Sequence, residues 1–155
     1  MIEFDENGFL KPYDIIETDL AMIEKIFVEE IPLSSTRKAI FDSYLSYNDQ
    51  LRKIIPAGFI QWIDGSFTTK KVNPNDIDIV TFVDFEVYNA NEKQIDQLRK
   101  TRQTTNRIID GYFVKIYPEN HKHLNWYEND KMQWLFTFNR VKYTKLSKGF
   151  LQINF

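Results

Sequence analysis

The first third of the chain carries apolar residues at helical spacing. Over residues 19–30 the apolar positions recur every three or four residues, which predicts an amphipathic helix. The same spacing predicts a longer helix from Ser34 or Ser35 to about Lys53. The preceding residues, 1–17, carry turn signals and are expected to form an extended arm.

Further along the chain, short apolar runs bounded by turn residues predict strands. The run that follows Asp78 is apolar on both faces, so this strand is expected to be central in its sheet. Trp134 and Phe136 are expected to lie in the sheet core. The predicted strands are Phe59–Ile63, Ile77–Val83, Tyr112–Tyr117, Met132–Phe138 and Phe150–Phe155.

A third helix is predicted between the second and third of these strands. It starts at Asn89 or Asn91 and ends near Ile108. The order strand, helix, strand indicates a βαβ-like unit, with helices before it and strands after it. We therefore expect an α/β or α+β fold, in which helices flank a mixed sheet and residues 1–155 form a single domain.

Composition narrows the chemistry of any site. The chain has 155 residues, of which 43% are hydrophobic, so it is long enough and apolar enough to bury a core. It has no cysteine, which excludes disulfides and thiolate metal sites. No apolar run approaches the ~18 residues of a membrane span, and the acidic N-terminus lacks a signal-peptide pattern. A cytoplasmic protein without a membrane partner is expected.

Charge is distributed unevenly along the chain. The net charge of -2 gives no general nucleic-acid footprint. Residues 1–35 are strongly acidic, whereas residues 131–155 contain no acid. The bases of this last segment are Lys131, Arg140, Lys142, Lys145 and Lys148. Two interpretations stay open: the segment is a solvated face, or it meets phosphate or an acidic partner.

Two aspartates stand one residue apart at the head of the second predicted strand. Because strand side chains alternate between faces, Asp76 and Asp78 are expected to point to the same side. Two neighbouring carboxylates repel each other unless a cation, a proton or an arginine compensates them. No basic residue lies within the strand itself. A divalent cation such as Mg²⁺, bound by oxygen ligands and substrate phosphates, is the natural compensation.

A Gly-Ser pair follows the first predicted strand and indicates a phosphate site. Gly65 lets a ligand or another backbone segment approach closely. Ser66 is expected to begin a short helical turn, where its amide and hydroxyl can donate to a phosphate. Lys70 adds positive charge nearby. One strand end would thus supply phosphate donors and its neighbour metal ligands.

The segment DGSFTTKKVNPNDIDIV resembles the signature of the DNA polymerase beta-type nucleotidyltransferase superfamily. That signature is an apolar strand, Gly-Ser, a spacer of nine or more residues, and an acid-apolar-acid triplet. Here Gly65-Ser66 is followed by nine residues and then Asp76-Ile77-Asp78. The whole chain, from FDENGFLKPYD to KGFLQINF, also resembles a family of small bacterial proteins of unknown function within that superfamily.

The resemblance implies a third carboxylate on a neighbouring strand. Asp110, in IIDGYFVKIYP, is expected to supply it. An alternative alignment puts Lys115 at that position, in which case the third acid would be missing and catalysis would be in doubt.

The resemblance further implies Mg²⁺-dependent (or Mn²⁺-dependent) nucleotidyl transfer from a nucleoside triphosphate (NTP). Asp76, Asp78 and Asp110 would be the metal-holding catalytic residues, with Asp110 also accepting the hydroxyl proton. Gly65, Ser66 and Lys70 would bind the nucleotide phosphates, the first two holding the terminal ones.

The acceptor hydroxyl is left open among a protein side chain, an RNA end and a small molecule. Some small superfamily members are antitoxins that modify a partner toxin, so a protein acceptor is expected first, by analogy. An alternative class is a catalytically silent nucleotide-binding or protein-interaction module on the same fold. A third is a nucleic-acid binder that uses the basic segment, which the negative net charge disfavours.

Overall fold

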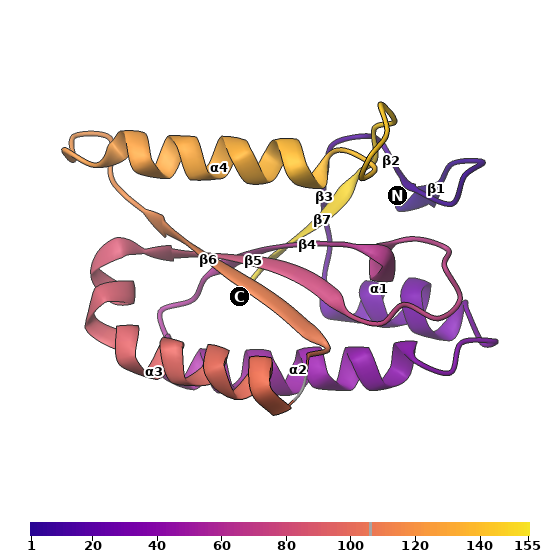
Figure 1. The fold of residues 1–155 in the computed structure, drawn as a ribbon, viewed down its shortest axis with the longest axis horizontal. Helices are drawn as coiled ribbons and strands as arrows, with labels where there is room; N and C mark the ends of the chain where they lie inside the picture. Colours follow the sequence, from indigo (N-terminus) through magenta and orange to yellow (C-terminus); the bar gives the residue numbers. More distant parts are fainter. Residues whose placement is uncertain (106) are drawn as a thin grey trace.

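In the computed structural model of the chain, helices cover both faces of a mixed sheet (Figure 1). The structure describes the backbone of residues 1–105 and 107–155, and the side chains of 1–101 and 107–155. Over these residues the strand order in the sheet is β3-β7-β4-β5-β6. Neighbours β5 and β6 are parallel, as are β3 and β7, whereas β4 is antiparallel to both β5 and β7.

The elements follow one another with short connections. The sheet strands are β3 (Ile15–Glu17), β4 (Ile60–Asp64), β5 (Ile77–Asp84), β6 (Ile109–Ile116) and β7 (Phe150–Asn154). A separate hairpin in the N-terminal arm pairs β1 (Glu3–Phe4) with β2 (Leu10–Lys11). The helices are α1 (Leu20–Glu24), which continues as a π-helix over Lys25–Glu29, α2 (Arg37–Ile54), a 3₁₀ turn (Ser66–Thr68), α3 (Phe85–Thr105) and α4 (Leu124–Phe138).

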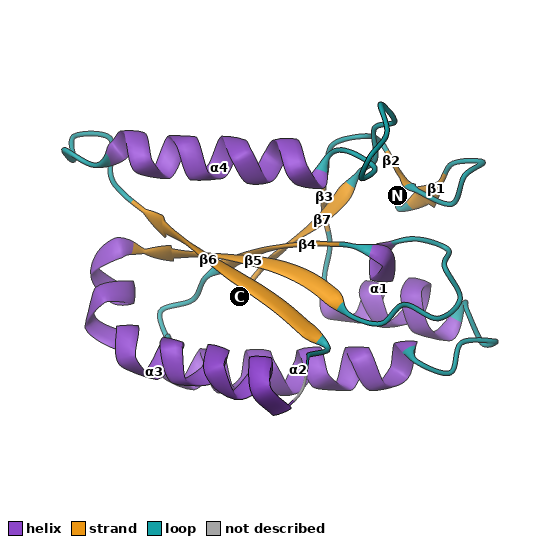
Figure 2. Cartoon of the chain, in the orientation of Figure 1, coloured by secondary structure: helices purple, strands orange, loops and turns teal. Residues whose placement is uncertain are grey.

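The two faces of the sheet bury different helices. Helices α1, α2 and α3 cover one face, and α4 lies across the other (Figure 2). The larger core, on the α1–α3 side, packs residues such as Ile63, Ile77 and Ile79 against these helices. The smaller core, under α4, consists of Trp62, Val80, Phe82, Val114, Phe138 and Phe150. Strand alternation puts even-numbered residues of β4, β5 and β6 on the α4 side.

The α/β fold class and the single mixed sheet are confirmed, and so is the βαβ-like middle, in which α3 connects parallel strands β5 and β6. Helix α3 starts at Phe85, earlier than predicted. The Asp84 carboxylate explains this start, because it accepts hydrogen bonds from the backbone N–H groups of Glu86 (2.9 Å) and Val87 (3.1 Å). Its carboxylate therefore caps the helix where β5 ends.

The predicted strand over Met132–Phe138 is wrong, because this segment is the second half of α4. The apolar residues at 132, 134, 136 and 138 alternate, which is typical of a strand, but helical spacing also relates Tyr127, Trp134 and Phe138. These last three pack against the smaller core. Phe136 is consequently 59% exposed rather than part of a sheet core, and Trp134 is half-buried on the helix. Packing of this face against the smaller core stabilises the helix rather than a strand.

Among the described residues, no helix is both long enough and apolar enough to cross a membrane.

Candidate functional site

Three aspartates lie side by side on adjacent strands. Asp64 on β4 is the register partner of Asp78 on β5, and Asp78 is in turn the register partner of Asp110 on β6. Neighbouring strands lie about 4.8 Å apart, and paired residues point to the same face. The three carboxylates therefore form a row across the sheet on its α4 side.

Asp76 adds a fourth carboxylate to this row. It lies two residues before Asp78, just ahead of β5, and is half-buried. It lines the same cleft as Asp64, Asp78 and Asp110. The structure thus gathers the three sequence-predicted metal-holding residues and adds Asp64, which the sequence did not single out.

The cleft has a volume of about 1410 Å³. Its walls come from four places: the strand ends, the loop over 65–71, the C-terminal half of α4 with the hairpin that follows, and the Asn7–Phe9 turn of the N-terminal arm. That arm and that hairpin lie at the same end of the sheet (Figure 1). The basic residues of the lining are Lys70, Lys71, Arg140, Lys142 and Lys148. The cleft therefore has an acidic floor and, apart from the buried Lys148, a basic rim.

Burial and mutual repulsion raise the pKa values of the floor carboxyls. For Asp78, burial is the largest cause, followed by the negative charges of Asp76, Asp110 and Asp64, and its pKa rises to about 7. The pKa of Asp76 is raised by burial and then by Asp110, against the opposing charge of Lys71. The protein alone leaves this negative charge under-compensated.

The raised pKa of Asp78 leads to a prediction about stability. Asp78→Asn is expected to raise the free energy of unfolding at pH 8 and to flatten its dependence on pH. A carboxyl whose pKa is higher in the folded state binds its proton more tightly there, so proton binding stabilises the fold. This stabilisation is complete below about pH 4 and is lost as pH rises through about 7. Urea unfolding of the metal-free protein at pH 5 and pH 8 measures this. Asp49→Asn, exposed on α2, is the control. A variant less stable than wild type at pH 8 would contradict the expectation.

Gly65 brings the backbone against the Asp78 carboxylate. Its backbone angles are φ 86° and ψ -165°, a region that is essentially restricted to glycine. A Cβ at this position would overlap Asp78 Oδ2. The glycine is therefore required both by the turn that ends β4 and by close approach to the acidic row.

A buried arginine holds the loop that follows Gly65. Arg37 begins α2 and is fully buried. Its guanidinium donates to the backbone carbonyls of Phe67 (2.6 Å), Thr69 (2.6 Å), Lys71 (3.2 Å from Nε) and Phe27 (3.1 Å). Burial lowers the pKa of Arg37 to about 10, so it stays charged at neutral pH. The loop over 66–71 is thus tied to α2 and to the π-helix.

The remaining predicted phosphate ligands lie on this loop. Ser66 begins the 3₁₀ turn and lines the cleft, and within the described residues its hydroxyl makes no hydrogen bond. Lys70 is exposed, its backbone N–H donates to Gly8 O (3.0 Å), and its ammonium lies over the Phe4 ring. The N-terminal arm therefore gives the loop a second support in addition to Arg37.

The family comparison covers nearly the whole chain. A model of a family of unknown function, DUF6932, matches residues 2–154. The chain belongs to this family. No curated protein and no solved structure gives a significant match. Because the DUF6932 match runs from the N-terminal arm to the end of β7, it includes every residue of the cleft.

The alternative position for the third carboxylate, Lys115, lies away from the cleft. It is the register partner of Val83 near the far end of β6, and strand alternation puts it on the opposite face from Asp110. Its ammonium donates to Asn89 Oδ1 (2.8 Å) on α3. Asp110, by contrast, lies beside Asp78 and accepts a hydrogen bond from the Tyr112 hydroxyl (3.3 Å).

The donor set of the cleft fits a hard divalent cation by its chemistry. Carboxylate oxygens are the ligands that Mg²⁺ prefers, and a cation would neutralise the neighbouring negative charges that, after burial, raise the pKa of Asp78. Among the described residues, no group of three or more His, Cys, Asp or Glu side chains is already arranged to hold a metal ion. Mg²⁺ commonly completes its shell with water and substrate phosphate, so a fully formed protein cage is not required.

Sequence reasoning missed several residues of this site. Arg37 continues the apolar stripe of Ile40, Phe41 and Tyr44 back by one turn, and this spacing was an available signal that it is buried. Lys148 belongs to the basic segment, but its buried ion pair with Asp64 depends on β4 and β7 being neighbours, which no local pattern reveals.

Proposed function

We propose that this protein is a Mg²⁺-dependent nucleotidyltransferase that moves a nucleoside monophosphate from an NTP to a hydroxyl acceptor. The observation that carries the proposal is the gathering of Asp76, Asp78 and Asp110 beside Gly65-Ser66 in one cleft. The resemblance of the Gly-Ser and Asp-x-Asp pattern to the polymerase beta-type superfamily supports the same reaction class.

In this proposal Asp76, Asp78 and Asp110 hold Mg²⁺ or Mn²⁺. The bound ion supplies charge stabilisation of the phosphates and lowers the pKa of the acceptor hydroxyl. Gly65 leaves room for a phosphate near the acidic row, and Ser66 donates to it from the amide and hydroxyl. Lys70, on the rim, adds positive charge toward the same phosphates.

The reaction forms one bond and breaks one. The acceptor oxygen bonds to the α-phosphorus, while the bond from that phosphorus to the α–β bridging oxygen breaks and pyrophosphate leaves with the electron pair. The hydroxyl proton passes to Asp110. The Tyr112 hydroxyl, 3.3 Å from Asp110 Oδ2, orients that carboxylate. Positioning and charge stabilisation carry the catalysis.

The size of the cleft leaves room for the acceptor. Pockets for one small ligand have volumes of about 300–1,000 Å³, and this cleft, at about 1410 Å³, is larger. The cleft then has room for the NTP and for the part of the acceptor that carries the hydroxyl. A protein partner, such as a toxin modified by an antitoxin-type enzyme, is the acceptor class that the resemblance favours.

Calorimetry with each of the four NTPs tests the proposal. Wild-type protein is expected to bind an NTP with Mg²⁺ and not with EDTA. Asp76→Asn/Asp78→Asn is expected to weaken that binding by more than about 100-fold, since loss of even outer-shell partners of a metal weakens its binding about 10- to 100-fold. Asp42→Asn/Asp49→Asn removes two exposed carboxylates of α2 and serves as the charge-matched control. Absence of NTP binding in all conditions would refute the proposal.

Turnover separates an enzyme from the catalytically silent alternative. Water can replace the acceptor, so a nucleotidyltransferase is expected to release pyrophosphate slowly from the NTP that it binds. Transfer of label from α-labelled but not from γ-labelled NTP to a hydroxyl acceptor would identify the nucleotidyl group as the one transferred. Metal-dependent NTP binding without pyrophosphate release would favour the silent module.

A further inference from the structure

The cleft contains a buried lysine that the proposed mechanism does not use. Lys148, just before β7, is almost fully buried, and its Nζ lies 2.7 Å from both carboxylate oxygens of Asp64. Lys148 and Asp64 both line the acidic cleft. By contrast, the other bases of the lining, such as Lys70 and Lys142, are exposed.

The position of Lys148 is set from both ends of the residue. Its backbone N–H donates to Asn139 O (3.0 Å), and the Asn139 side chain donates to Lys148 O (2.9 Å). Asn139 directly follows α4, so this helix fixes the backbone of Lys148. Asp64 fixes the ammonium at the other end. An ammonium with so little freedom loses little entropy when it binds a ligand.

Stability alone is a poor reason for this ion pair. Taking two charges out of water costs several kcal/mol per ion, and replacing such pairs with apolar residues is often neutral or stabilising. A pair held at this cost in the wall of a cleft is better explained by something that binds there.

Within the described residues the Lys148 ammonium donates to Asp64 alone, which leaves binding capacity beside the phosphate loop. A lysine ammonium has three donor hydrogens, and the two Asp64 oxygens accept at most two of them. Asp64 immediately precedes Gly65 and Ser66, the first residues of the loop. We infer that Lys148 is a preorganised phosphate-binding cation of the nucleotide site, positioned by Asp64. This inference rests on the proposed function and adds a ligand to it.

The test uses inorganic tripolyphosphate with Mg²⁺, which carries the phosphates of an NTP without a base. In Lys148→Met/Asp64→Asn both charges are removed together, so no unpaired charge is left buried and the variant is expected to stay folded. Calorimetry should show its affinity for Mg²⁺–tripolyphosphate reduced about 10- to 100-fold, the effect of losing a charged hydrogen bond. Lys148→Arg keeps a cation at the position and should retain most of the affinity.

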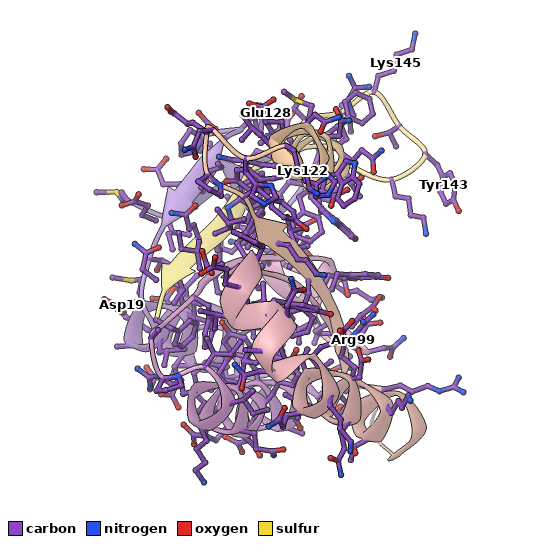
Figure 3. The ribbon with its side chains drawn as sticks, turned by 90° about the vertical axis from the view of Figure 1, so that its left-hand side faces the viewer. Asp19, Arg99, Lys122, Glu128, Tyr143 and Lys145 are labelled. Atoms are coloured by element: carbon purple, nitrogen blue, oxygen red, sulfur yellow. The ribbon has the colours of Figure 1, made fainter. Side chains whose placement is uncertain are left out.

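The control is Lys145→Met. Lys145 belongs to the same basic segment but projects away from the molecule (Figure 3), and it does not line the cleft. Its replacement should leave the affinity unchanged.

The outcomes distinguish the inference from the function on which it rests. Wild-type binding that Asp76→Asn/Asp78→Asn abolishes and Lys148→Met/Asp64→Asn leaves intact would overturn the role of Lys148 alone. In that case the pair only neutralises Asp64 next to Asp78. Wild-type protein that binds neither Mg²⁺–tripolyphosphate nor any NTP would overturn the proposed function and this inference together.

Discussion

Gly65→Ala is expected to abolish Mg²⁺-dependent NTP binding and to lower the free energy of unfolding. The backbone at Gly65, φ 86° and ψ -165°, lies in a region that only glycine occupies readily, so alanine there costs about 1–3 kcal/mol. The new Cβ would also overlap the Asp78 carboxylate, which must then move. A displacement of about 1 Å in a catalytic site can reduce the rate by ~10²-fold.

A second glycine separates the loss of stability from the loss of the site. Gly58 also has a positive φ of 98°, and a Cβ there would overlap the Phe155 carbonyl rather than any cleft residue. Gly58→Ala should destabilise the protein in urea unfolding while its folded fraction binds Mg²⁺–NTP as wild type does. Wild-type affinity in Gly65→Ala would contradict the proposed arrangement of the glycine against Asp78.

Arg37→Met is expected to lower the free energy of unfolding by about 3 kcal/mol or more, because each buried carbonyl left without a donor costs about 1–3 kcal/mol. Methionine resembles arginine in length but donates no hydrogen bond. Carbonyls that include those of Phe67, Thr69 and Lys71 would lose a donor in a buried environment. The loop over 66–71 should then separate from α2.

Two measurements check this expectation. Guanidinium unfolding at pH 7 gives the loss of stability, and hydrogen exchange of the amides of residues 66–71 shows where the protein loosens. Arg37→Lys keeps the charge without the planar fork and should fall between wild type and Arg37→Met. Lys38→Met, which removes the exposed neighbouring base, is the control. A change of less than about 1 kcal/mol in Arg37→Met would show that the loop is held by other contacts.

The four aspartates of the proposed site differ in how far their negative charge is compensated. Asp76, Asp78 and Asp110 are left under-compensated at the floor of the cleft, whereas Asp64 is neutralised by Lys148. The acidic row therefore has a free part, which suits a cation, and a part that is already paired. The pairing of Asp64 with Lys148 offsets part of the repulsion among the four carboxylates, although the charge of Asp64 still raises the pKa of Asp78.

Local patterns were sufficient for the parts of the fold that depend on neighbouring residues in the sequence. Period-two alternation predicted that Asp76 and Asp78 share a face, and both line the cleft. The Gly-Ser pair predicted a turn at the end of β4. The same alternation misled at Met132–Phe138, because a seven-residue apolar pattern also fits a helix that starts earlier, at Leu124.

Residue order alone predicts the α/β class, the order of the main elements except α4, and an Asp-x-Asp pair that follows a Gly-Ser turn. These depend on side-chain periodicity, which is local. The tertiary structure decided the register that sets Asp110 and Asp64 beside Asp78, the burial of Arg37 beneath the loop, and the contact of Lys148 with Asp64. Each of these contacts joins segments that are distant in sequence. Such segments are brought together by the order of the strands and the docking of the helices, and both depend on burial of the whole core.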